Sequence, residues 1–348
     1  MNIYLALGLV AVISFLIAFL LGFIVIPWLR KLKFGQTILE EGPIWHKSKQ
    51  GTPIMGGIMF AISTIISVVA VLVTDHLLGG NFFVGELAGS HTQKVKLIAC
   101  VLLALGFGLV GFADDYIKVV KKRNLGLTVI QKTVAQVAIM VGFLATFHIN
   151  GLTFMKIPFV GTISFAGGFE WFYWLFGACV IYGAVNAVNF TDGVDGLCAG
   201  VTSVTAIAFC ITAVMSRFFG ISILAAALAG GCLGYLIWNY YPSKVMMGDT
   251  GSMFLGGMVV GLAYAIDCPL ILIFFGVIYV IEALSDVLQI GYFKATHGKR
   301  IFKMAPIHHH FEMSGWKERK IVTIFSLVNM IGCAIGLALY YFGIINVK

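Results

Sequence analysis

The feature that most constrains this sequence is a series of ten apolar runs separated by short connections. They lie at about residues 3–27, 53–75, 95–113, 129–148, 171–190, 197–216, 220–239, 252–266, 269–291 and 321–344. A helix needs roughly 20 apolar residues to cross the hydrocarbon core of a bilayer. Only 11% of the 348 residues are charged, whereas about 25% is usual for a soluble domain. The sequence therefore predicts an all-α polytopic membrane protein with about ten transmembrane helices, in one domain spanning residues 1–348.

The basic residues are divided unevenly between alternate connections. The connections 28–52, 114–128, 191–196, 240–251 and 292–320 carry most of the lysines and arginines, whereas the opposite ones carry Lys94, Lys156, Arg217 and little else that is basic. Cytoplasmic loops of membrane proteins are enriched in Lys and Arg. We therefore expect the five basic loops to be cytoplasmic and both termini to lie outside. In the outer connection 149–169, short β-type runs broken by Pro158 and Gly161 predict a small surface hairpin.

Carboxylates collect at the predicted cytoplasmic ends of the helices. Asp114 and Asp115 end the third run, Asp192 and Asp195 lie between the fifth and sixth runs, and Asp249 precedes the eighth. A single Asp at such a boundary is equally suited to capping the next helix. Carboxylates near hydrocarbon are nevertheless functional candidates, and several of them beside many lysines are typical of a divalent cation with phosphates.

Two further groups of polar residues lie near the C-terminus. His308, His309 and His310 are consecutive, so a regular backbone does not direct their side chains to one zinc ion. An imidazole at this place can instead bind phosphate or act as an acid or base. Glu282, Asp286 and Gln289 share one face of the ninth helix. That face either lines a substrate cleft or forms a buried structural network.

Six segments of the chain match, in order, the signature segments of one enzyme family. They are 42–49 (GPIWHKSK), 51–57 (GTPIMGG), 114–118 (DDYIK), 186–197 (NAVNFTDGVDGL), 247–252 (MGDTGS) and 300–310 (RIFKMAPIHHH). On these segments the chain resembles, over nearly its full length, the phospho-N-acetylmuramoyl-pentapeptide transferases of the polyprenyl-phosphate hexose-1-phosphate transferase superfamily. The Ala-Pro-Ile-His-His-His run is typical of the muramoyl branch.

The resemblance implies an activity and its partners. The donor is UDP-N-acetylmuramoyl-pentapeptide, the acceptor is undecaprenyl phosphate, the cofactor is Mg²⁺, and the products are UMP and lipid I, an intermediate of peptidoglycan synthesis. It also implies a multi-pass homodimer in the bacterial inner (plasma) membrane, with a cleft that faces the cytoplasm and a ninth helix that is broken or bent. Membrane lipid surrounds it, and no nucleic-acid partner is expected.

The resemblance also assigns roles to residues of this chain. Asp249 becomes the Mg²⁺ ligand, with Asp192 as a second candidate, and Asp114 and Asp115 become the pair beside the acceptor phosphate. His308 joins these aspartates as a catalytic candidate. The substrate-binding candidates are Lys49, Lys118, Lys132, Asn189, Asp192, Gly193, Asp195, Asn239, Met246, Gln289, His309 and His310. The family often has an aromatic residue where this chain has Met246, so the side chain that stacks on uracil is left open.

Two mechanisms and two other functions stay open at the level of sequence. The acceptor phosphate either attacks the donor directly, or an aspartate first forms a covalent phospho-sugar enzyme. A sister transferase that moves N-acetylglucosamine-1-phosphate onto the same carrier would need the same carboxylates, so that only the loop 292–320 argues against it. A transporter for anionic solutes would carry its charged residues near the bilayer midplane, whereas here they lie at one interface.

Overall fold

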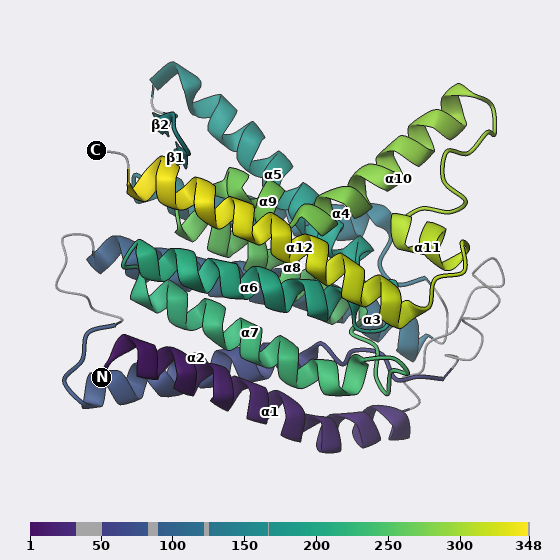
Figure 1. Cartoon of the computed structure of the whole chain (residues 1–348), viewed down its shortest axis with the longest axis horizontal. Helices are drawn as coiled ribbons and strands as arrows, with labels where there is room; N and C mark the ends of the chain where they lie inside the picture. The colour runs from purple at the N-terminus through teal and green to yellow at the C-terminus, as the bar shows by residue number, and fades with distance from the viewer. Residues whose placement is uncertain (33–50, 83–89, 122–124, 166, 347–348) are drawn as a thin grey trace.

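The computed structural model describes residues 1–32, 51–82, 90–121, 125–165 and 167–346, and most of them are helical (Figure 1). The long helices are α1 (Ile3–Lys31), α2 (Ile58–Leu77), α3 (Ser90–Val120), α4 (Val129–Ile149), α5 (Glu170–Phe190), α6 (Leu197–Met215), α7 (Phe219–Asn239), α8 (Gly248–Ala265), α10 (Val277–Ala295) and α12 (Glu318–Tyr340). Short elements are η2 (Gly167–Phe169), η3 (Pro269–Ile271), α9 (Leu272–Phe275), α11 (Ile307–Glu312) and η4 (Tyr341–Ile345). Each predicted apolar run is occupied by one long helix or, at 269–291, by the bent set η3, α9 and α10.

The prediction of an all-α polytopic membrane protein is confirmed. Among the described residues, eight helices are long and apolar enough to cross a bilayer, and a ninth span is formed if α9 and α10, which meet at 88°, are counted as one. The bend that we expected in the ninth helix is thus present. The prediction of ten spans depends on α8, which is not one of these eight helices and whose first turns contain Asp249, Thr250 and Ser252.

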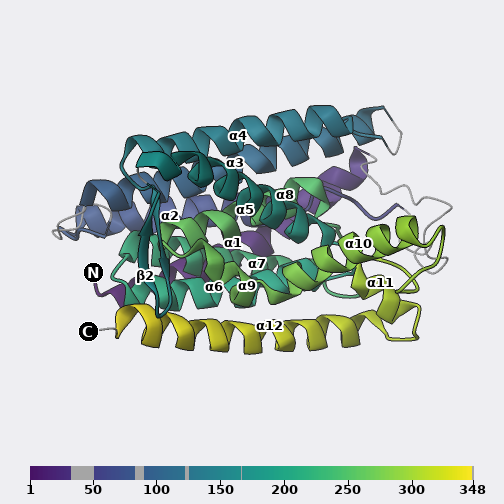
Figure 2. The same ribbon diagram turned by 90° about the horizontal axis from the view of Figure 1, so that it is seen from above.

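Helix α8 lies inside the bundle, where Figure 2 shows it surrounded by other helices. All of its residues from Thr250 to Ala265 are buried. Glycines allow the close approach: a Cβ on Gly111 of α3 would collide with the carbonyl of Asp249, and a Cβ on Gly57 would collide with Gly251. Small residues of this kind let helices pack tightly in lipid. Because protein rather than lipid covers α8, its polar first turns are tolerated.

The bend between α9 and α10 is held by polar side chains of two other helices. Interrupting a helix in a bilayer leaves backbone groups without partners, and neighbouring helices must satisfy them. The carbonyl of Phe275 accepts hydrogen bonds from the Thr205 hydroxyl of α6 at 2.6 Å and from the Asn329 amide of α12 at 3.2 Å. The Asn329 carbonyl oxygen in turn accepts the Ile278 N–H at 3.5 Å. Both sides of the bend are therefore tied to the bundle.

The predicted surface hairpin is also present. Strands β1 (Phe154–Ile157) and β2 (Gly161–Ser164) pair in antiparallel fashion, with Phe154 opposite Ser164. The N–H of Lys156 in β1 donates to the carbonyl of Asp267 at 2.7 Å. The Asp267 carboxylate forms ion pairs with Lys96 of α3 and, at 3.6 Å, with Lys156. This ion-pair cluster joins the hairpin to the turn after α8.

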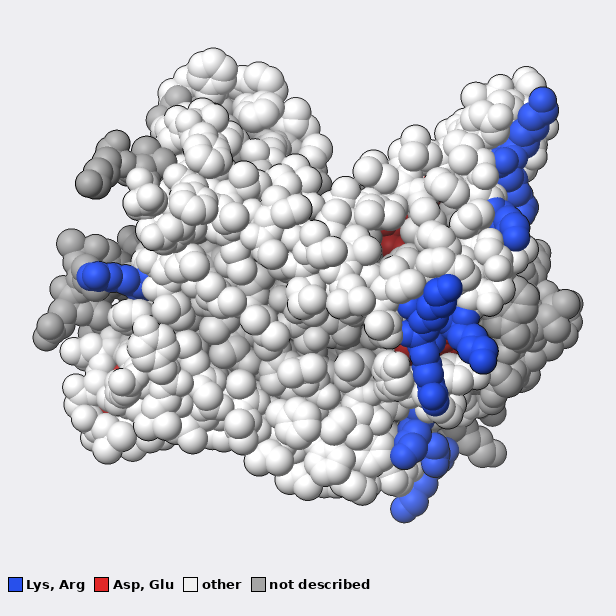
Figure 3. All heavy atoms as spheres, in the orientation of Figure 1, with Lys and Arg blue, Asp and Glu red and all other residues white. Residues whose placement is uncertain are grey.

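The two ends of the bundle differ in charge. The N-terminus and the C-terminal end of the chain lie at one end, and α10 and α11 lie at the other (Figures 1 and 2). On the face drawn in Figure 3, most of the visible Lys and Arg side chains gather at the end away from the termini. This arrangement agrees with the division of basic residues between alternate loops, whose assignment to the cytoplasm stays a prediction.

Candidate active site

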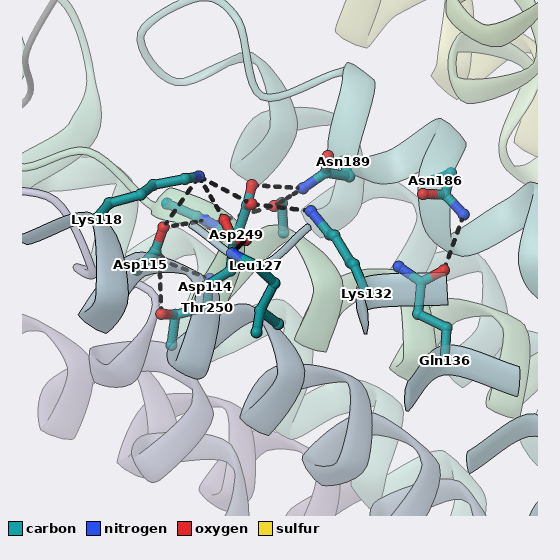
Figure 4. A network of polar contacts seen from close by, with 12 residues as sticks. Asp114, Asp115, Lys118, Leu127, Lys132, Gln136, Asn186, Asn189, Asp249 and Thr250 are labelled. Atoms are coloured by element: carbon teal, nitrogen blue, oxygen red, sulfur yellow. Dashed lines mark hydrogen bonds and ion pairs between the residues drawn. The ribbon is translucent and has the colours of Figure 1, made fainter. Parts of the chain in front are cut away.

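The candidate site centres on Asp249, in the first turn of α8. Its Oδ2 lies 2.9 Å from the Nζ of Lys132 and 3.2 Å from the Nζ of Lys118, and its Oδ1 accepts a hydrogen bond of 2.9 Å from the Asn189 amide (Figure 4). The same Asn189 amide donates to Ser252 at 2.8 Å. Four helices, α3, α4, α5 and α8, therefore bring their side chains to one carboxylate. The sequence analysis selected the four charged or amide residues of this group.

Asp114 lies in the last turns of α3, next to Asp249. Its Oδ2 forms an ion pair with Lys118, and its Oδ1 accepts the N–H of Leu127 at 2.8 Å. Leu127 precedes Thr128, which begins α4 with a capping box. This bond fixes the entry into α4, and one turn later α4 presents Lys132 to Asp249. Asp114 therefore both faces the site and positions one of its lysines.

Asp115 shares Lys118 with Asp114, at 3.9 Å, but its hydrogen bonds go to α8. Its Oδ2 accepts the N–H of Thr250 at 2.9 Å and the hydroxyl of Thr250 at 2.7 Å, and its Oδ1 accepts the N–H of Asp249 at 3.3 Å. The first N–H groups of a helix have no partner within the helix. The carboxylate of Asp115, which is 2% exposed, supplies that partner from α3. Asp115 thus holds the turn that carries Asp249.

The carboxylate oxygens of Asp114, Asp115 and Asp249 lie within 4.8 Å of one another, an arrangement that can hold a metal ion. Hard cations such as Mg²⁺ prefer such oxygen ligands and keep positions for substrate phosphates and water. All three carboxylates have partners, but the Asp249 side chain is the most exposed of them, at 20% against 5% for Asp114 and 3% for Asp115, and fits the role of ligand best. Asp192, our second candidate for a ligand, is not part of this cluster among the described residues.

The loop 191–196 lies between α5 and α6 and is fastened to the segment before α8. Asp195 accepts the N–H of Ser243 at 3.0 Å, and Asn239 accepts the N–H of Gly196 at 3.0 Å. The Asn239 amide also donates to the carbonyl of Val245 at 2.9 Å. The structure therefore places Asp195 and Asn239, both predicted to bind substrate, in bonds that shape the loop. Asp192 and Gly193 lie on this loop between Asn189 and Asp195.

The three consecutive histidines have different hydrogen-bond partners, although the rings of His308 and His309 lie with their centroids 4.1 Å apart. His308 is fully buried, and its Nδ1 lies 3.0 Å from Oε2 of Glu282 in α10. The Nδ1 of His309 lies 2.7 Å from Glu312, and the Nδ1 of His310 accepts the N–H of Lys303 at 3.1 Å. Of the three, His308 contacts the loop of Gly193, since a Cβ at Gly193 would collide with its Nε2.

Comparison with known proteins identifies the family. The sequence model of the family described as glycosyl transferase family 4 matches residues 97–267 of this chain. The chain is 44% identical over 336 residues to a phospho-N-acetylmuramoyl-pentapeptide-transferase of Desulforamulus reducens, covering 96% of each chain. It is 42% identical over 331 residues to the enzyme of that name from Bacillus subtilis, covering 93% of this chain and 94% of the relative. The chain belongs to the phospho-N-acetylmuramoyl-pentapeptide transferase family. The resemblance that we drew from six segments is thereby confirmed.

Three further residues that the transferase resemblance assigned to substrate binding have other surroundings or are not described. Gln289 accepts the N–H groups of Ile301 and Phe302 at 3.1 and 3.0 Å and thus holds the loop after α10. The Met246 sulfur accepts a bond from Ser243 at 3.4 Å. Lys49 lies outside the described residues. A substrate role for these three residues stays a prediction.

The sequence analysis missed one pairing in this transferase. Glu282 was placed on an inward face of the ninth helix, but its partner His308 was not recognised. The signal was available in principle, because a carboxylate within an apolar helix requires a partner, and a histidine of a neighbouring loop is a natural one.

Proposed function

We propose that this protein transfers phospho-N-acetylmuramoyl-pentapeptide from its UDP-linked donor to undecaprenyl phosphate, giving lipid I and UMP. We propose that the reaction takes place at the cytoplasmic face of the bacterial inner membrane and requires Mg²⁺. The observation that carries the proposal is the group around Asp249, in which Lys118, Lys132 and Asn189 meet two further carboxylates at one end of a membrane bundle. The names of the relatives, which match over nearly the whole chain, supply the substrates.

The chemistry needs the charge balance of this group because both substrates are anions. The ammonium groups of Lys118 and Lys132 offset the repulsion between the acceptor phosphate and the donor pyrophosphate. Mg²⁺ held by Asp249 would neutralise further phosphate oxygens. Asn189 keeps the Asp249 carboxylate in its orientation by bonding to Oδ1. Catalysis then consists mainly of positioning and electrostatic stabilisation.

We propose direct displacement. An oxygen of the acceptor phosphate attacks the β-phosphorus of the donor, and the bond from that phosphorus to the bridging oxygen breaks, so that UMP leaves with this oxygen. Asp114 accepts the proton that remains on the acceptor phosphate at low pH. Support comes from Asp249, whose two oxygens are engaged by Lys118, Lys132 and Asn189. A carboxylate held in this way is less suited to act as a nucleophile than as a ligand.

The decisive experiment measures UMP release by purified protein in detergent. It supplies undecaprenyl phosphate with UDP-N-acetylmuramoyl-pentapeptide or UDP-N-acetylglucosamine, each with and without Mg²⁺. We expect release that requires the muramoyl donor, the lipid phosphate and Mg²⁺. Release with UDP-N-acetylglucosamine alone would assign the protein to the sister transferases, and a folded sample inactive with both donors would refute the proposal. Light scattering on the same sample tests the homodimer, which a monomer mass would contradict.

A further inference from the structure

The most unusual buried group outside the Asp249 cluster is the pair Glu282–His308. Both side chains are at most 1% exposed, although both are ionisable. Glu282 lies in α10, one and a half turns after the bend at Gly276, and His308 lies in the first turn of α11. A carboxylate in a membrane helix is costly and is usually paired when it is buried. The contact between Nδ1 and Oε2 at 3.0 Å provides that pairing.

Each member of the pair also has one atom without a partner. Oε1 of Glu282 and Nε2 of His308 are buried and have no hydrogen-bond partner among the described residues. A buried polar atom without a partner costs roughly 1–3 kcal/mol. A purely structural contact that leaves two such atoms without partners therefore lowers the stability of the folded protein. Apolar side chains of similar volume would avoid the cost.

The surroundings of Nε2 connect the pair with the candidate site. Nε2 lies against Gly193, where any side chain would collide with it. Gly193 belongs to the loop that begins after Asn189, the residue that donates to Asp249. On the other side, the N–H of His308 also approaches Oε2 of Glu282, at 3.5 Å. The ring is thus held from α10, and its free nitrogen is directed toward the loop 191–196.

We propose that Glu282 is a positioning residue that orients His308 and sets its tautomer, so that Nε2 faces Gly193 in the loop 191–196, which we place beside the substrate phosphates. An ionised Glu282 accepts the Nδ1–H, which makes Nε2 an acceptor in the neutral ring and a donor when the ring takes up a proton. Carboxylates orient functional imidazoles in the same manner at many metal and triad sites. The inference rests on the proposed function, since it assigns a contact to the same substrates.

Three variants test the proposal by separating the two nitrogens of the ring. His308→Asn keeps an amide near the position of Nδ1 and lacks one at Nε2, whereas His308→Gln has the reverse geometry. Glu282→Gln removes the charge that fixes the tautomer. Glu170→Gln is the control, because Glu170 is exposed in the first turn of α5 and is not among the candidate site residues. We expect this control to keep most of its activity.

Two readouts are needed, the melting temperature in detergent and the rate of Mg²⁺-dependent UMP release. We expect His308→Asn to melt near the wild-type temperature, because it retains the contact with Glu282, and yet to lose turnover. Glu282→Gln should lower kcat by about 10- to 100-fold, the usual effect of removing a partner that orients a histidine. It should also change the pH dependence of kcat, which a purely structural contact would not affect.

The outcomes distinguish this inference from the proposed function. Wild-type turnover in His308→Asn or in Glu282→Gln would overturn the inference while leaving the transferase activity in place. Wild-type protein that released no UMP from either donor would instead refute the proposed function. In that case the melting temperature of Glu282→Leu still tests whether Glu282 holds His308, because this variant leaves Nδ1 without its partner, and a variant as stable as wild type would show that the contact is not needed.

Discussion

Asp114 and Asp115 are neighbours in the chain and share an ion pair with Lys118, but their hydrogen bonds go to different parts of the chain. Asp114 contacts Lys118 and the backbone before α4, whereas Asp115 binds the first turn of α8 through three hydrogen bonds. Helical geometry explains the difference, since consecutive residues point about 100° apart around the helix axis. We therefore expect Asp115 to act on the reaction indirectly, through the position of Asp249.

A double-mutant cycle tests this role. Thr250→Val removes the hydroxyl that donates to Asp115 and should lower turnover at limiting Mg²⁺ by about fivefold, which corresponds to roughly 1 kcal/mol for one hydrogen bond. In the double variant with Asp115→Asn, the loss of activity, expressed as a free energy, should be smaller than the sum of the losses in the two single variants. Both changes affect one interaction. The loss of turnover in each variant is measured as the rate of UMP release over a range of Mg²⁺ concentrations.

Thr323→Val is the control for this cycle, because the exposed Thr323 hydroxyl bonds only to Arg319 of its own helix in the contacts seen here. Full activity of Thr250→Val, combined with an inactive Asp115→Asn, would contradict the indirect role. It would indicate that Asp115 itself binds the metal or transfers a proton.

The sequence was informative at this scale where charged residues mark a helix end. Asp114, Lys118, Lys132, Asn189 and Asp249 were all selected, and the structure brings them together. Contacts between residues far apart in the chain could not be predicted in the same way. The direction of each imidazole at 308–310 depends on Glu282, Glu312 and the loop backbone, none of which a local pattern specifies.

Among the elements, the bent pair α9 and α10 depends most on its neighbours. Asn329 of α12 donates to the Phe275 carbonyl and accepts the Ile278 N–H, so one side chain serves both sides of the bend. The 88° angle turns α10 away from the direction of α9. As a result, Glu282 in α10 is brought to His308.

Replacing Asn329 tests this dependence. Asn329→Leu keeps a similar volume but leaves the Ile278 N–H without its acceptor and the Phe275 carbonyl with the Thr205 hydroxyl and the Cys333 thiol. We expect a loss of about 1–2 kcal/mol of stability, measured as a lower melting temperature in detergent. Met330→Leu, on the exposed side of α12, is the control and should melt as wild type does. An unchanged melting temperature for Asn329→Leu would show that the bend does not need this residue.

The limits of most helices followed from hydropathy, and the exceptions have physical causes. We predicted the eighth helix to begin at residue 252, whereas α8 begins at Gly248. The extra turn is polar, and it is stabilised by Asp115 of α3 rather than by any neighbour in sequence. A pattern based on apolar residues cannot detect a helix turn whose cap comes from another helix.

At the scale of the whole molecule, the ion-pair cluster of Lys96, Lys156 and Asp267 joins elements far apart in the chain. Lys96 is 2% exposed and contacts Asp267 from α3, and Lys156 reaches the same carboxylate from the hairpin. A buried ion pair contributes little net stability compared with apolar residues, but breaking it leaves an uncompensated charge. The cluster should therefore be sensitive to the loss of its buried member.

We expect Lys96→Met to lower the stability by about 3 kcal/mol, read as a lower melting temperature. Lys156→Met should have a smaller effect, because the Lys156 side chain is 32% exposed and solvent screens its charge. The double variant Lys96→Met with Asp267→Asn should recover part of the loss, since no buried charge remains and Lys156, which loses its partner, is partly exposed. Equal losses in Lys96→Met and Lys156→Met would contradict the distinction between buried and exposed partners.

The position of α8 inside the bundle has a consequence for how the chain enters the membrane. Its polar first turns, from Gly248 to Ser252, favour water over lipid when the segment is alone, whereas they are buried in the folded protein. Partition of this segment into the bilayer during synthesis therefore depends on helices made before it, above all α3, which supplies the cap from Asp115. Assembly of the protein is accordingly cooperative: α8 becomes a stable part of the membrane only when α3 is already in place to receive it.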